Sequence, residues 1–275
     1  MSRTSKAVAY AALLLLSGMF LIPFVWTVST SLKDGQQVFA YPPQWIPSPP
    51  QWENFPKAWT ALPFTQWVLN TLLITVACTI GQVLTGSLAA YGFSRFQFRG
   101  RNAMFYTMLA TMMLPGQVTM IPVFMIWREL QAIDTFWPLI LPAFFGGGAF
   151  NIFLIRQFFL SLPREVDEAA MLDGASYPRI WWSILLPMSG PVIATVAVLS
   201  FIGHWDEFNG PLIYLNSPEK YTVSIGLRMF QDSYGSETHL LMAASLIHIL
   251  PTILLFFAAQ RYFLRGINLS GLGGR

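Results

Sequence analysis

Charge is the property that this sequence has least of. Asp, Glu, Lys and Arg make up 11% of its 275 residues, whereas soluble domains carry about 25%. It has one cysteine, Cys78, so neither an intrachain disulfide nor a cysteine metal cluster is possible. The three histidines, His204, His239 and His248, have no metal-binding helical spacing. We therefore expect no metal site.

The machinery of an enzyme or a nucleic-acid-binding protein is also missing. No G-x-x-x-x-G-K-[ST] loop occurs, so the chain cannot bind ATP by that route. His204 with Asp206 and Glu207 is the only titratable cluster, and adjacent carboxylates point apart on a helix. Basic patches with interleaved aromatic residues are absent. We expect no catalytic residue, no cofactor bound by this chain and no nucleic-acid partner.

The sequence contains long stretches without any charged residue. Six uncharged stretches are each long enough for a bilayer core, which needs about 20 apolar residues per helix. They lie at 7–32, 58–94 (apolar from near Trp67), 102–127, 135–155, 180–205 and 238–260. Buried helices of a large soluble protein are the alternative, but six in so short a chain disfavour it. The pattern predicts an all-α polytopic membrane protein with six transmembrane helices.

Lys and Arg predict the orientation of these helices. With both termini in the cytoplasm, eleven basic residues lie inside and five outside. The inner ones are Arg3, Lys6, Arg95, Arg99, Arg101, Arg156, Arg164, Arg179, Arg261, Arg265 and Arg275, and the outer ones Lys33, Lys57, Arg128, Lys220 and Arg228. The first stretch is long and has no small-x-small cleavage site, so we expect a retained helix rather than a signal peptide.

Three regions follow along the chain. Residues 1–66 hold the first transmembrane helix and an outer loop rich in Pro and Trp, where proline excludes a regular helix. Residues 67–264 form the transmembrane core, with a cytoplasmic loop at 161–187, and 265–275 form a Gly-rich cytoplasmic tail. Gly86 and Ala90 in the second span are a small-xxx-small pair, which favours close helix packing either within the chain or with another subunit.

The inner loop at 161–187 encodes a short helix outside the membrane. Ser161 is a candidate N-cap, with Pro163 in the first turn. Acidic residues gather near the helix start, where the dipole favours anions, and Gly174 is a natural stop. A second short helix is expected to begin at Pro178 and to end before Pro187.

This short helix suits a protein partner better than a lipid surface. Helices that rest on the cytoplasmic leaflet are usually basic, because that leaflet is negative, and this one is acidic. Ala169, Ala170 and Gly174 allow close backbone approach, while Met171 and Leu172 offer apolar contact. A partner with Lys or Arg around a groove fits best.

Glu168-Ala169-Ala170, Asp173-Gly174-Ala175 and Leu186-Pro187 together resemble the E-A-A loop of binding-protein-dependent ABC importer permeases. Residues 89–95, 113–115, 260–263 and Leu212 also resemble the carbohydrate branch of that family, of maltose or oligosaccharide type. The resemblance covers nearly the whole chain. It implies a type I importer (MetI-like) permease fold in a bacterial-type inner membrane, with 161–187 as the coupling loop. The residues that it assigns to ATPase coupling are Glu165, Glu168, Ala169, Ala170, Met171, Asp173, Gly174 and Pro187.

The resemblance also implies partners. These are a homologous second permease, a dimeric ATP-binding subunit that holds ATP and Mg, an extracytoplasmic solute-binding protein and the lipid bilayer. The outer segment 213–237 matches the loop that meets the solute-binding protein, and 266–275 matches a tail that reaches the ATPase. A secondary transporter driven by an ion gradient is the alternative function. It is disfavoured because the span interiors contain no Asp, Glu, Lys or Arg.

The resemblance implies a sugar, an oligosaccharide or a related polar molecule as the solute, and glycerol-phosphate compounds are equally compatible with it. Polar side chains in or near the spans are candidates for its path, and each has the alternative of bonding a neighbouring helix. The candidates are Gln117, Asn151, Trp205, Glu207, Asn209 and His248, with Gln82 and His204 also considered. The family often has Trp-Asn-Glu where this chain has Trp205-Asp206-Glu207, so the sequence carries an extra acidic group there.

Overall fold

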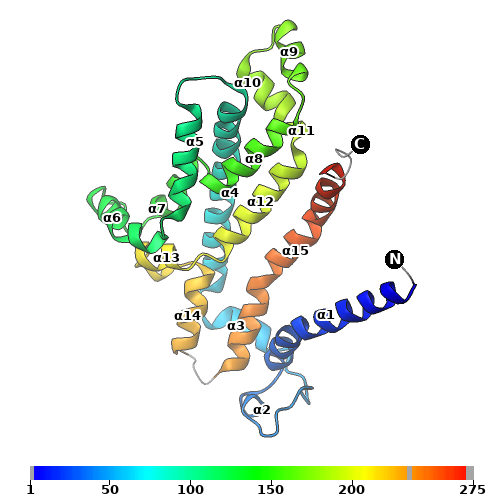
Figure 1. Cartoon of the computed structure of the whole chain (residues 1–275). Helices are drawn as coiled ribbons and strands as arrows, with labels where there is room; N and C mark the ends of the chain where they lie inside the picture. The colour runs from blue at the N-terminus through cyan, green and yellow to red at the C-terminus, as the bar shows by residue number, and fades with distance from the viewer. Residues whose placement is uncertain (1–2, 234–236, 271–275) are drawn as a thin grey trace. The chain divides into compact units, whose positions relative to one another are not determined.

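The computed structural model describes residues 3–233 and 237–270, and every regular element in these two ranges is helical. Figure 1 labels the helices. Contacts divide the chain into two units. Unit 1 comprises Met1–Thr65 and Ile225–Leu250, and unit 2 comprises Gln66–Ser224 and Pro251–Arg275. Helix α15 (Thr238–Ser270) extends into the predicted tail at 265–275, and residues 271–275 of that tail lie outside the described residues.

Four segments of the described chain are long and apolar enough to cross a bilayer. They lie in α1 (Arg3–Ser31), in α4 (Phe64–Arg95), across Trp137–Ser161 and in the first part of α15. The Trp137–Ser161 segment consists of α7 (Trp137–Ile140), the 3-10 turn Leu141–Phe144 and α8 (Ala149–Ser161). The two remaining uncharged stretches form bent helix pairs. The six predicted spans therefore correspond to four long segments and two bent pairs.

The first bent pair turns by 100° at a proline. Helix α5 (Arg101–Ala110) and the 3-10 turn Thr111–Met113 lead to an extended Leu114, and α6 (Gly116–Glu129) begins after Pro115. A residue before proline is disfavoured in the helical conformation, which explains why the helix stops there.

The second bent pair turns by 84° near Ser189. Helix α10 (Tyr177–Ile180) continues through a π-helical turn, Trp181–Leu185, into α11 (Leu186–Met188), and α12 (Gly190–Trp205) follows. The prediction that this helix ends before Pro187 is wrong. Proline inside a helix clashes with the carbonyl one turn earlier, and the wider π turn directly before it makes room.

In unit 1, the loop that follows α1 folds back on the end of that helix. The Asn54 side chain donates to the carbonyls of Ser31 and Lys33, both at 2.8 Å. The Lys33 ammonium lies 3.9 Å from the centre of the Trp26 ring, and burial lowers the pKa of Lys33. Two short helices, α2 (Gly35–Val38) and α3 (Asn54–Ala61), lie in this loop. The exclusion of helix there is wrong for both, because α2 contains no proline and Pro56 of α3 occupies the first turn, where no N–H is needed.

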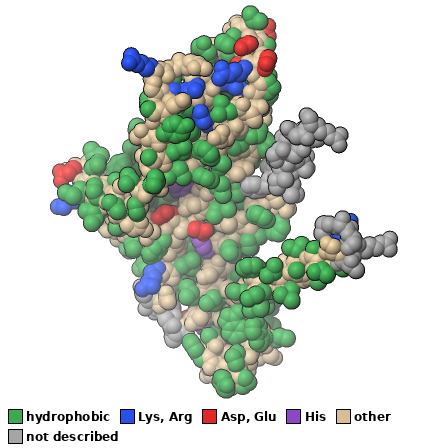
Figure 2. Space-filling model, viewed as in Figure 1, with side chains coloured by type: hydrophobic (Ala, Val, Ile, Leu, Met, Phe, Trp, Pro, Cys, Tyr) green, Lys and Arg blue, Asp and Glu red, His purple; other side chains and the backbone are tan. Residues whose placement is uncertain are grey.

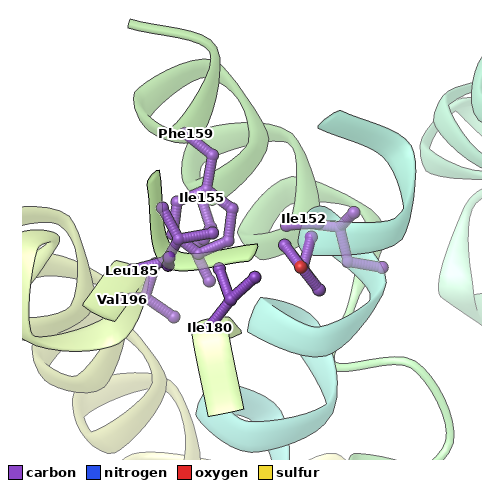
Figure 3. Packing of buried hydrophobic residues seen from close by; sticks show 9 residues of the cluster. Ile152, Ile155, Phe159, Ile180, Leu185 and Val196 are labelled. Carbon is purple, nitrogen blue, oxygen red and sulfur yellow. The ribbon is translucent and has the colours of Figure 1, made fainter. Parts of the chain in front are cut away.

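The core of unit 2 brings five helices together. Its buried members come from α4, α8, α9 (Glu165–Leu172), the α10–α11 segment and α12 (Figure 3). On α8 they are Ile152, Ile155 and Phe159, which share one helical face. Ala170 of α9 belongs to the same cluster. The short helix outside the candidate spans is thus anchored in the core of the unit.

Gly86 of α4 packs against the glycine turn that precedes α8. Gly147 there has a φ of +66°, and a Cβ on it would lie 2.5 Å from Gly86 Cα. Only glycine allows this approach of two backbones. The small-residue pair left two alternatives, packing within the chain or with another subunit. Gly86 packs within the chain.

Candidate coupling site and solute-facing cavity

Helix α9 has clear chemical reasons to begin and end where it does. Glu165, Asp167 and Glu168 occupy its first turn, where they complement the helix dipole. At its end Gly174 has a φ of +81°, Ala175 N donates to Ala170 O, and Gly174 N donates to Met171 O. This is a Schellman ending, so the predicted stop at Gly174 is confirmed.

The start of α9 differs from the prediction. Ser161 does not cap it, because Ser161 is the last residue of α8 and its hydroxyl bonds the carbonyl of Phe158. The N-cap position belongs to Arg164, which makes no side-chain cap. By sequence alone, Ser161 could either end α8 or cap α9. It belongs to α8, which is the longer helix and supplies more residues to the core.

Helix α9 presents two different faces. Asp167 and Ala170 are buried against the rest of unit 2. The other coupling candidates on the helix are exposed, namely Glu165, Glu168, Ala169 and Met171, as are Asp173, Gly174 and Pro187 beyond it. Leu172 at the tip has 90% of its surface exposed. Of the two alanines, Ala169 is available to a partner, whereas Ala170 serves the chain's own core.

A buried ion pair joins α9 to the end of α4. Arg95 Nε lies 2.6 Å from Asp167 Oδ2, and the two side chains are 6% and 11% exposed. Arg95 also donates to the carbonyl of Leu162 at 3.2 Å, at the end of α8. Burial raises the pKa of Asp167, against the opposing effect of Arg95. The pair therefore connects three helices, at the desolvation cost that buried charges carry.

Two more arginines hold backbone carbonyls at this end of unit 2. Arg156 Nε donates to Phe93 O, and Arg101 donates to Phe96 O at 3.1 Å. Figure 2 shows charged side chains of both signs gathered at the end of unit 2 that carries α9, with hydrophobic side chains covering the surface beside it. This distribution is typical of a membrane protein end that faces water.

Three of the predicted solute-path residues line one cavity. Gln117 of α6, Glu207 and Asn209 surround a space of about 490 Å³, together with Thr119 and Tyr214. Asn209 begins α13 (Asn209–Tyr214). In Figure 1, α6 and α13 lie at the end of unit 2 opposite α9. The cavity has the size of known small-molecule sites, roughly 300–1,000 Å³.

Asn151 lies in a neighbouring polar network. Its amide nitrogen is 3.3 Å from Gln82 Oε1, 2.9 Å from Gly147 O and 3.3 Å from Ser200 Oγ. Asn151, Gln82 and Ser200 line a second cavity of about 330 Å³ with His204 and Glu207. Glu207 thus belongs to both cavities.

The other two candidates lie elsewhere. Trp205 is 2% exposed and stacks on Phe201, with ring centres 5.6 Å apart, so it packs in the interior of unit 2. His248 is on α15 in unit 1, whereas the other candidates are in unit 2. Within the part of the chain that the structure describes, no group of three or more His, Cys, Asp or Glu residues is placed to hold a metal ion.

The loop after α13 is firmly tied to the rest of unit 2. Asp134 accepts hydrogen bonds from the backbone of Asn216 and Ser217, from the Ser217 hydroxyl and from Lys220 Nζ at 2.9 Å. The Ser217 contacts hold the pKa of Asp134 well below its usual range. The Trp67 indole donates to Pro218 O at 2.9 Å. This part of the predicted 213–237 segment is therefore a fixed surface, and α14 (Val223–Ser233) follows it.

Comparison with known proteins identifies a family. Residues 82–269 match the family described as "Binding-protein-dependent transport system inner membrane component". The chain is 34% identical over 211 residues to the arabinooligosaccharides transport system permease protein AraQ of Halalkalibacterium halodurans, covering 77% of this chain and 75% of that protein. It is 33% identical over 269 residues to the sn-glycerol-3-phosphate transport system permease protein UgpE of Yersinia pestis, covering 94% and 95%.

A solved structure shares the fold. It is a chain of a bacterial ABC transporter involved in the import of the acidic polysaccharide alginate, with a TM-score of 0.82 and 24% identity. The match covers 96% of this chain and 99% of that one. The predicted all-α, MetI-like permease fold is confirmed.

Proposed function

Because the chain belongs to the family of binding-protein-dependent transport system inner membrane components, we propose that it forms one half of the membrane pore of an ATP-driven importer. The observation that carries the mechanism is the two-faced helix α9. One face is built into the core through Ala170 and Asp167, so a push on the helix moves α4 and α8 with it. The other face is exposed for a partner.

The partner at α9 is a dimeric ATP-binding subunit. The exposed face combines carboxylates, Glu165 and Glu168, with an apolar tip at Leu172. A groove with an apolar floor and basic rim complements it, because opposite charges steer docking while apolar contact holds it. ATP and Mg are held by that subunit, since the sequence has no phosphate-binding loop.

Two further protein partners complete the importer. A homologous second permease supplies the other half of the pore, and an extracytoplasmic solute-binding protein delivers the solute. The fixed loop around Asp134 and Ser217 offers a preformed outer surface for that delivery. The distribution of Lys and Arg supports a cytoplasmic location for both termini in an inner membrane.

The transported solute is a sugar, an oligosaccharide or a related polar molecule. Support comes from the relatives, which are named for arabinooligosaccharides and sn-glycerol-3-phosphate. The cavity at Gln117 and Asn209, lined by amide and hydroxyl groups, is suited to a hydrogen-bonding solute.

Two substitutions on the exposed face of α9 test the coupling role. Glu168→Lys places a cation against a basic groove, and Leu172→Asp removes the apolar tip. In proteoliposomes that contain the assembled importer, we expect each to lower ATP-dependent uptake by at least about tenfold, since like charges at an interface cost several kcal/mol. Both residues are exposed, so membrane insertion stays unchanged. Glu129→Lys, the same change at an exposed end of α6, is the matched control.

The same preparation separates this function from its alternative. Retention of the ATPase on the tagged permease is measured alongside uptake, and both are expected to fall together in the two variants. Normal uptake in both variants would overturn the coupling role of α9. Uptake that continues without ATP but collapses with the proton gradient would show a secondary transporter instead.

A further inference from the structure

Glu207 lines three cavities of unit 2, namely the two described above and a smaller one of about 210 Å³ that it shares with His204. Glu207 lines the cavity of about 490 Å³ beside α6 and α13, and also the cavity of about 330 Å³ beside α8 and α12. Its Oε1 accepts the backbone N–H of Gly210 at 3.0 Å, which holds the carboxylate in the cavity wall. The carbonyl of Glu207 accepts the Ser224 hydroxyl, so the backbone is held as well.

The polar groups around this carboxylate are amides, hydroxyls and one imidazole. The larger cavity has Gln117, Thr119 and Asn209, and the smaller one has Gln82, Asn151, Ser200 and His204. Neither lining contains a Lys or an Arg among the described residues. At pH 8 an imidazole with the ordinary pKa of about 6.5 is neutral. The two cavities therefore contain one negative group and no permanent positive group.

From this lining we infer that the solute passing through this half of the pore is an uncharged polyhydroxyl compound, and that Glu207 disfavours anionic solutes. The inference rests on the proposed importer function and narrows it. Carboxylate and amide oxygens accept hydrogen bonds from sugar hydroxyls, and amide N–H groups donate to them. A carboxylate or phosphate on the solute would instead face a like charge in a partly enclosed space.

The family itself does not decide the charge of the solute. One relative is named for arabinooligosaccharides, which are neutral, and another for sn-glycerol-3-phosphate, which is anionic. The structure with the shared fold belongs to an importer of an acidic polysaccharide. For this chain, the charge of the solute is therefore inferred from the lining around Glu207 and not from the relatives.

Charged thiol reagents measure the charge of the cavity without knowledge of the solute. The background is Cys78→Ala, which removes the single cysteine, a buried one. In this background Gln117→Cys places a thiol in the cavity, and Leu130→Cys places a control thiol on an exposed residue outside both linings. The assembled complex is reacted at pH 8 with a cationic and with an anionic methanethiosulfonate. The ratio of the two rates is the readout.

We expect the cationic-to-anionic ratio at position 117 to exceed that at position 130 by about five- to tenfold, from one nearby charge in a wet cavity. Glu207→Gln should bring the ratio at 117 down to the control value and leave the ratio at 130 unchanged. Equal ratios at the two positions, or a ratio at 117 that Glu207→Gln does not lower, would overturn the inference.

The native solute provides the second measurement. The solute-binding protein that copurifies with the importer is denatured, and the released solute is analysed by mass spectrometry. A neutral sugar or polyol is expected, and a uronate or a phosphate ester would contradict the inference. Failure of the proposed importer function can be distinguished from failure of this inference. In the first case no ATPase or solute-binding protein copurifies, while the thiol measurement still reports the charge at Glu207.

Discussion

Replacing Arg95 by methionine removes the cation that joins α9 to α4 and α8. The substitution leaves the Asp167 carboxylate, whose side chain is 11% exposed, without its cationic partner, which costs about 3–5 kcal/mol. It also removes the charged hydrogen bond to the Leu162 carbonyl, for about 1.5–3 kcal/mol more. Asp167→Asn costs about 3–5 kcal/mol, because it leaves the buried Arg95 cation without its counter-ion. This is less than the total for Arg95→Met, because Arg95 keeps its hydrogen bond to the Leu162 carbonyl.

The double variant Arg95→Met with Asp167→Leu gives the sharper test. A buried ion pair that is replaced as a whole by apolar side chains often costs nothing, so this variant should be more stable than Arg95→Met alone. The free energy of unfolding is measured by SDS titration with tryptophan fluorescence. Arg179→Met is the control, an exposed arginine on α10 whose loss should change stability by no more than about 0.5 kcal/mol.

The same variants report on coupling. On the proposed function, detaching α9 from α4 and α8 should let ATP hydrolysis continue while less solute is moved, so the ATP hydrolysed per solute imported should rise in Arg95→Met. An Arg95→Met protein as stable as the Arg179→Met control would refute the reasoning. So would a double variant that is no more stable than Arg95→Met alone.

Two further changes test the packing and the outer loop. Gly147→Ala should strongly lower the melting temperature, because its Cβ would lie 2.5 Å from the backbone of Gly86. Gly92→Ala is the control: it has open space around it in α4, so it should be neutral or stabilising by up to about 1 kcal/mol. Equal melting temperatures for the two variants would contradict this. Asp134 has a depressed pKa in the folded protein, so its stabilising contribution is complete above the ordinary value of about 3.9 and is lost as the pH falls below it. A spin label at Asn216→Cys should therefore keep its restricted mobility from pH 7 to about 4 and become mobile only in stronger acid. In the Asp134→Asn background the same label should be mobile at every pH. A label that becomes mobile near pH 6 with Asp134 intact would be inconsistent with this assignment.

The helical spans could be predicted because a stretch without charged residues can be recognised directly along the sequence. Each uncharged stretch corresponds to one long helical segment or one bent helix pair, although the segment Trp137–Ser161 is interrupted between α7 and α8. The bend before α6 lies at Pro115, a local signal that the prediction of a single span overlooked. The stop of α9 at Gly174 was equally local, since it depends on one backbone conformation.

The ion pair between Arg95 and Asp167 could not be found in this way. The sequence has several inner arginines, and nothing local says which of them reaches α9. The same limit applies to Ala169 and Ala170, which are neighbours in one motif, yet only Ala170 is buried. Which residue of a short helix faces inward is decided by the elements packed beneath it.

The exposed tip of α9 affects the life of the subunit before assembly. Leu172 and Met171 lie outside the candidate spans, and they are exposed in the chain alone. Apolar surface that water can reach attracts unintended contacts. On the proposed function, a copy made in excess of its ATPase would keep this apolar end exposed until it was captured or degraded, so the proposed coupling contact would also act as a check on stoichiometry.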